Sequence, residues 1–168
     1  MTHPEIAKLL AILKVTYPNA QSADPAVQVA AWAMALSDIP YALAEAAIQR
    51  HVKRSKWHPT PSEIRELIAD AHGVLPDEAT AWQMVRQYIR DNGYINPAPW
   101  SGPSIVLEAV RAIGGFRQLR MSESPDRDRD AFGRAYRTYR ERALGEIDLG
   151  VAVAELTAGD LPVGAIGG

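Results

Sequence analysis

The stretch Lys53–Ile64, K-R-S-K-W-H-P-T-P-S-E-I, decides how this chain folds. It begins with a basic run, passes a tryptophan and ends in a helix start. In that start Thr60 suits the N-cap, Pro61 the first helical turn, and Glu63 the reach back to the cap. The stretch therefore predicts a sharp corner between two helices. We expect Trp57 to plug the junction between them, because replacing a buried tryptophan by alanine typically costs ~3–5 kcal/mol.

Helical periodicity extends to both sides of this corner, with apolar residues recurring three and four positions apart. The segments that show it are residues 4–17, 25–36, 41–53 and 61–72. We assign Trp32 and Tyr41 to the core of the lobe that these helices form. Four helices within residues 1–75 predict a first compact domain.

Helical stripes resume after Pro76, and no strand alternation is sustained. Residues 76–144 predict a second helical domain, interrupted by the proline-rich loop 96–103. Trp100 in that loop either anchors it to the core or presents an aromatic ring to a partner. We expect residues 145–168 to be a mostly flexible tail, with at most a short helix or strand over 151–156. The chain is thus predicted to be all-α, with two small helical lobes and a flexible C-terminal tail.

Composition narrows the classes of function. With 47% hydrophobic and 23% charged residues, the 168-residue chain is typical of a globular protein. Its net charge of -2 argues against binding a polyanion by bulk electrostatics. The absence of cysteine excludes disulfides, thiolate metal sites and thiol nucleophiles. No signal-peptide pattern and no apolar run of ~18 residues is present, so we expect a cytoplasmic protein without membrane association.

Motifs that carry catalysis are missing. The sequence contains no phosphate-binding G-x-x-x-x-G-K-[ST] loop, no G-x-S-x-G nucleophile elbow and no H-E-x-x-H pair. Its four histidines match no spacing of metal ligands. We therefore expect a protein that is not an enzyme and holds no cofactor or metal.

Basic residues are the first candidates for binding a partner. Arg50, Lys53, Arg54 and Lys56 lie within seven positions and have no acidic residue among them. Helical geometry places the first three on one face. They either contact phosphate or an acidic protein, or they are solvated cations that complement the C-terminal dipole of their helix.

The last predicted helix carries the second set of candidates, Arg134, Arg137 and Arg140, which we also expect to contact a partner. Tyr136 and Tyr139 lie among them. Such tyrosines either stack on exposed nucleic-acid bases or close a protein core with their rings.

Three motifs together resemble a known family. The first helix ends in T-Y-P-N, the second carries W-x-M-A-L-S-D-I-P-Y, and the third ends in H-V-K-R-S-K-W-H-P-T-P-S-E-I. Over roughly residues 5–72 this resembles the N-terminal helical lobe of bacteriophage proteins that load and inhibit the hexameric replicative helicase. After residue 76 the chain departs from that pattern and resembles the rear half of other phage and prophage replication proteins.

The resemblance implies a small all-α adaptor without a nucleotide site of its own. Such a protein binds a DnaB-type hexameric helicase, holds it inactive and helps to deliver it to the origin or fork. In that family the segment after the N-terminal lobe is flexible and takes part in gripping the helicase.

The alternative is a small DNA-binding protein, for packaging or regulation, in which the corner at Trp57 imitates a helix-turn-helix. Against it, Glu63, Glu66 and Asp70 on the following helix would repel phosphate.

Overall fold

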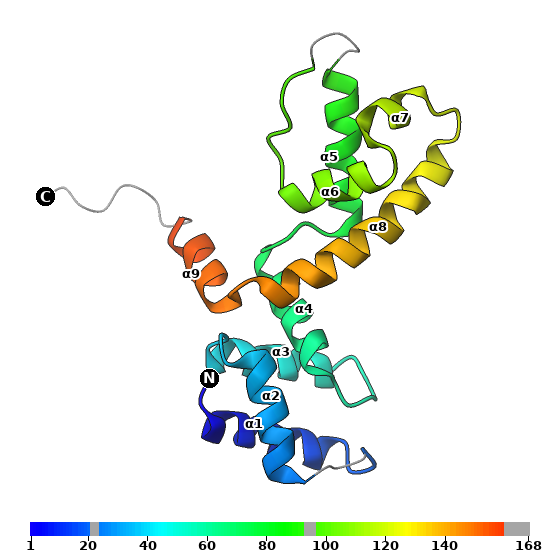
Figure 1. Ribbon diagram of the computed structural model, residues 1–168. Helices are drawn as coiled ribbons and strands as arrows, with labels where there is room; N and C mark the ends of the chain where they lie inside the picture. The colour runs from blue at the N-terminus through cyan, green and yellow to red at the C-terminus, as the bar shows by residue number, and fades with distance from the viewer. Residues whose placement is uncertain (21–23, 93–96, 160–168) are drawn as a thin grey trace, which may run out of the picture. The chain divides into compact units, whose positions relative to one another are not determined.

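The computed structural model describes residues 1–20, 24–92 and 97–159 of the chain. In these residues it contains nine helices and no strand, which confirms the all-α prediction (Figure 1). The helices divide into two compact units. Unit 1 comprises Met1–Val74 together with the segment that begins at Ile147, and unit 2 comprises Leu75–Glu146.

Unit 1 is built around the predicted corner. Its helices are α1 (His3–Thr16), α2 (Pro25–Leu36), α3 (Tyr41–Val52), α4 (Pro61–His72) and α9 (Leu149–Gly159). The capping box at α4 is present as predicted: Thr60 Oγ1 accepts from the Glu63 N–H at 3.3 Å, and the Thr60 N–H donates to Glu63 Oε2 at 2.7 Å. That N–H donor lowers the pKa of the Glu63 carboxyl below its usual value. Gly73 ends α4 with φ 64°, a left-handed conformation that favours glycine.

The core of unit 1 follows the predicted stripes. Its fully buried side chains are Ile6, Leu9, Leu13, Leu36, Ile39, Ile48, Ile64 and Ile68. Trp32 is buried as predicted, whereas Tyr41 is half-buried and donates its hydroxyl to Glu45 at 2.9 Å. The axes of α2 and α3 turn through 107°, so that consecutive helices enclose the core instead of running on.

Trp57 does not plug the corner, and that prediction is wrong. Its side chain is 71% exposed, and the Lys56 ammonium lies 5.2 Å from the ring centroid. Instead the junction is closed by Pro59, which is buried, and by His58. The His58 ring packs edge-on between Tyr17 and Trp32, with centroids 5.8 and 6.0 Å away. The rings that brace the corner therefore come from three segments of the sequence.

The C-terminal segment also differs from the predicted tail. Residues 149–159 form α9, which packs against α4 and buries Leu149 and Val153. Its first turn approaches the backbone oxygen of Asp38 so closely at Gly150 that a side chain there would collide with it. The apolar residues of this segment find a partner because unit 1 leaves one face of α4 uncovered without them. Residues 160–168 lie outside the described part of the chain.

Unit 2 contains α5 (Glu78–Asp91), α6 (Ser104–Ala112), α7 (Gly115–Met121) and α8 (Pro125–Glu146). Its core is Ala81, Val85, Ile105, Val106, Ala109, Val110, Leu119, Phe132 and Tyr136. The rings of Phe132 and Tyr136 are stacked at 5.5 Å, and Trp82 packs 5.2 Å from Phe132. Apolar packing between α6 and α8, with α5 alongside, holds this unit together.

Trp100 anchors its loop, so the structure resolves the two alternatives left open by the sequence. Its ring is half-buried, 5.4 Å from Tyr88 and 5.5 Å from Phe116. The indole N–H donates to the Pro103 carbonyl at 3.1 Å. The beginning of the loop, at Asn96, lies outside the described residues.

Tyr136 makes unit 2 sensitive to alkaline pH. Its hydroxyl donates to the Pro76 carbonyl at 2.6 Å, and burial raises the pKa of Tyr136 from 10.0 to about 12. Because the folded-state pKa lies above the unfolded-state value, the stabilisation is complete below pH 10.0 and is lost as pH rises toward 12. We expect Tyr136→Phe to lower the free energy of unfolding by about 1 kcal/mol at neutral pH and to remove this alkaline loss.

Urea denaturation at pH 7 and at high pH, followed by circular dichroism, measures the effect. Tyr139→Phe makes the same chemical change on a half-buried ring and is the matched control, which should keep the alkaline loss. An equal alkaline loss in wild type and Tyr136→Phe would contradict the prediction.

Candidate functional site

A groove between α3 and α4 is the candidate site of unit 1. It encloses about 450 Å³. Its lining residues are Leu43, Ala46, Ala47, Gln49, Arg50, Lys53, Arg54, Leu67, Ile68, Ala71 and His72. Ala47 and Ile68 are buried, Leu43 and Leu67 are half-buried, and the other two alanines are exposed. The groove thus has an apolar floor that is open to a partner.

Three of the predicted partner-binding cations line this groove. Arg50, Lys53 and Arg54 come from the last turn and the C-cap region of α3, and all three are exposed. None of the described residues that line the groove is acidic. Positive charge at this helix end is favourable because the carbonyl groups there carry partial negative charge. The structure therefore supports both interpretations of the basic run: the cations suit the helix end, and they also border an apolar depression.

Lys56, the fourth cation of the basic run, does not line the groove and instead lies over the exposed Trp57 ring. The corner is held by its backbone. The Trp57 N–H donates to Ser55 Oγ at 3.1 Å, and the Trp57 carbonyl lies 2.8 Å from His51 Nε2. An ordered loop therefore presents this tryptophan and lysine to solvent.

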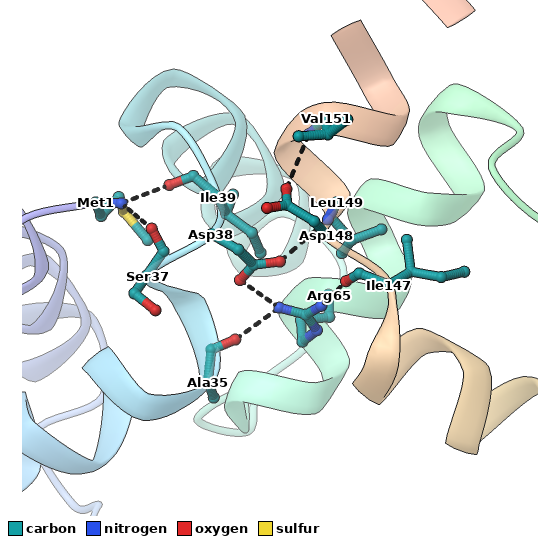
Figure 2. A network of polar contacts seen from close by, with 10 residues as sticks. All are labelled: Met1, Ala35, Ser37, Asp38, Ile39, Arg65, Ile147, Asp148, Leu149 and Val151. Carbon is teal, nitrogen blue, oxygen red and sulfur yellow. Dashed lines mark hydrogen bonds and ion pairs between the residues drawn. The ribbon is translucent and has the colours of Figure 1, made fainter. Parts of the chain in front are cut away.

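The α4 wall of the groove is fixed from behind by a polar network (Figure 2). Arg65 on α4 donates to Asp38 Oδ1 at 2.6 Å and to the Ala35 carbonyl at 2.7 Å. Its other terminal nitrogen donates to the Ile147 carbonyl at 2.6 Å, and the Leu149 N–H donates to Asp38 Oδ2 at 3.0 Å. The side chains of Arg65 and Asp38 are only 10% and 22% exposed. One buried ion pair thereby ties α4 to the end of α2 and to the start of α9.

The three candidates on α8 do not form a common surface. Arg134 is exposed, and Arg137 forms an ion pair with Glu78 at 2.6 Å. Arg140 is buried, 8% exposed, which corrects the prediction that its side chain is available to a partner. Tyr136 is fully buried and Tyr139 half-buried under the Arg142 guanidinium, so these rings belong to the protein and are not open to nucleic-acid bases.

Sequence reasoning missed the apolar floor of the groove because Leu43, Leu67 and Ala71 continue the core stripes of their helices. Periodicity identifies a stripe but does not say which of its edges stays uncovered. The available signal was position: each of these residues lies within one or two helical turns of a cation or of His72.

A second exposed apolar feature lies on α2. This helix carries no charged residue, and Val27 and Met34 are 61% and 88% exposed. In the described residues no single helix has both the length and the apolar composition needed to cross a membrane. The same residues contain no cluster of three or more histidine, aspartate or glutamate side chains suited to hold a metal ion.

Comparison with known proteins bears on α1 to the start of α4. Comparisons with curated proteins and with solved structures gave no match. Residues 1–65 match the family model for the N-terminal domain of a phage helicase loader/inhibitor. The resemblance predicted from the sequence is thereby confirmed for this N-terminal segment, which is similar to the N-terminal domain of that loader/inhibitor family.

Proposed function

We propose that this protein is a phage or prophage replication accessory protein that binds a hexameric, DnaB-type replicative helicase and controls its loading or activity. The observation that carries the proposal is the family match over residues 1–65. It is supported by the groove, because α3 and its three cations lie inside the matched segment and form one wall of an open apolar depression.

The protein would act by binding alone, as a cytoplasmic adaptor and not as an enzyme. Without a nucleotide-binding motif it has no energy source of its own to drive the helicase between states. Any effect on loading or unwinding must therefore come from a difference in affinity for two helicase states. A preference of about tenfold for one state corresponds to ~1.4 kcal/mol of coupling, which is within the usual range for such effects.

Co-elution tests the proposal. The full chain is mixed at micromolar concentration with the hexameric helicase encoded by the same phage or prophage, and the mixture is analysed by gel filtration with light scattering. We expect a stable complex whose formation changes the ATPase or unwinding rate of the helicase. Clean separation of the two proteins under these conditions would remove this function.

One observation favours the alternative function, DNA binding: an exposed tryptophan with a lysine over its ring stands beside the basic run. Aromatic rings of this kind stack on the bases of single-stranded nucleic acid. Against it, Glu63, Glu66 and Asp70 are all exposed on α4, the helix that follows the corner. Affinity for DNA that falls steeply with salt and is lost in Trp57→Ala would favour this alternative.

A further inference from the structure

We infer that the α3–α4 groove binds an amphipathic helix of the partner protein, with apolar residues on one face and acidic residues along its flank. The inference rests on the proposed function, since the partner would be the helicase. It specifies the kind of segment that the groove accepts.

The shape of the groove favours a helix. Two helical walls that meet in an apolar floor are the surface into which an amphipathic helix lays its apolar residues, spaced three and four positions apart. Leu43 and Leu67 come from opposite walls, and Ala46 and Ala71 leave room between them because their side chains are small. A volume of about 450 Å³ accepts several apolar side chains of a docking helix.

The charge of the groove decides what flanks those apolar residues. Within the described part of the chain, Arg50, Lys53 and Arg54 form no ion pair, although all three border the groove. The described lining includes no acidic side chain, so an approaching carboxylate meets no like charge there. Acidic residues on the partner would therefore raise the association rate and fix the orientation of its helix.

A nucleic acid fits this surface less well than a helix does. Phosphate contacts require cations but make no use of an apolar floor such as the one between Leu43 and Leu67. The exposed carboxylates of Glu63, Glu66 and Asp70 on α4 would repel a duplex that followed this helix. Charge and shape together thus favour an acidic helix over DNA.

The direct test uses two designed peptides of about 18 residues, which is five helical turns. Both carry leucine at the same helical face, and the remaining positions are glutamate and alanine in one and lysine and alanine in the other. Binding to the full chain is followed by peptide fluorescence anisotropy and by amide NMR shifts. We expect the glutamate peptide to shift the amides of Leu43, Leu67 and Ala71, and the lysine peptide to bind at least about tenfold more weakly.

Two variants of the full chain locate the binding site. Lys53→Glu/Arg54→Glu reverses the charge at the groove and should weaken binding of the glutamate peptide about tenfold or more. Lys8→Glu/Lys14→Glu makes the same charge change at exposed positions of α1 outside the groove and is the matched control, expected within about twofold of wild type. Ala46→Gln/Ala71→Gln fills the groove at exposed positions without a charge change and should also weaken binding.

Equal binding of both peptides, or binding that neither groove variant weakens, would overturn the inference. So would a short DNA duplex that displaces the glutamate peptide and binds more tightly than it does. The groove variants are also mixed with the helicase. If they co-elute with it as wild type does, the inference fails and the proposed function stands; if wild type itself does not co-elute, the proposed function fails whatever the peptides do.

Discussion

Replacing Asp38 by alanine should destabilise unit 1 by about 3 kcal/mol, because it leaves the Arg65 guanidinium buried without its charge partner. The Asp38 carboxylate accepts from Arg65 at 2.6 Å and from the Leu149 N–H at 3.0 Å, so one substitution loosens both α4 and α9 (Figure 2). Breaking a buried pair typically costs ~3–5 kcal/mol. We place Asp38 at about the lower end of that range because 22% of its side chain remains exposed and water can reach part of the site.

Amide hydrogen exchange of core residues such as Leu9 and Ile64 measures the loss in unit 1 separately from unit 2. The double variant Asp38→Ala/Arg65→Met is the matched control, since it removes the charge that Asp38→Ala strands. It should be less destabilised than the sum of the two single variants, by ~1–3 kcal/mol. Additive losses, or faster exchange that leaves α9 unaffected, would contradict the role given to this network.

Replacing Phe132 by alanine should remove most of the stability of unit 2. The side chain is fully buried at the centre of the cluster, stacked on Tyr136 and packed against Trp82. Truncation of a buried phenylalanine costs ~3–5 kcal/mol. For a small domain this approaches the whole free energy of unfolding, of which ~5–15 kcal/mol is typical and small domains hold the lower values.

Phe132→Leu keeps most of the volume and is the control, with an expected loss of ~1 kcal/mol. Exchange at Val85, Val106 and Ala109 reports on unit 2, and we expect it to approach the unprotected rate in Phe132→Ala. Protection retained at these three residues would show that another contact, and not the aromatic stack, holds α8 against α6.

The corner at α4 was predictable and the residue that closes it was not. Thr60, Pro61 and Glu63 determine a helix start through contacts within four positions, and local contacts of this kind can be read from a sequence. Which aromatic ring fills the junction depends on Tyr17 and Trp32, which approach from other segments. The size of Trp57 favours it as the plug, but size alone does not determine burial.

The segment after Glu146 shows the same limit. Asp148 caps α9 by accepting from the Val151 N–H at 2.9 Å, and this local signal was readable. The contacts that hold the helix in place, from Leu149 to Asp38 and from Arg65 to Ile147, join residues far apart in the sequence. The glycines and the apolar composition of the segment favour a loose tail when they are considered alone.

At the candidate site, the cations were predictable and their surroundings were not. Arg50, Lys53 and Arg54 share a face by helical geometry alone, and the structure places them together. The apolar floor depends on how far α3 and α4 cover one another. The charge of Arg140 favours a place on the surface, and only the packing of α8 shows that it is buried.

Hydrogen–deuterium exchange of the full chain, with and without the hexameric helicase, tests most directly whether this protein is a helicase-binding adaptor that uses the α3–α4 groove. We predict that added helicase slows exchange in peptides covering residues 43–54 and 67–72, and that Lys53→Glu/Arg54→Glu abolishes this protection. Unchanged exchange throughout unit 1 at helicase concentrations that saturate any complex would contradict the proposal.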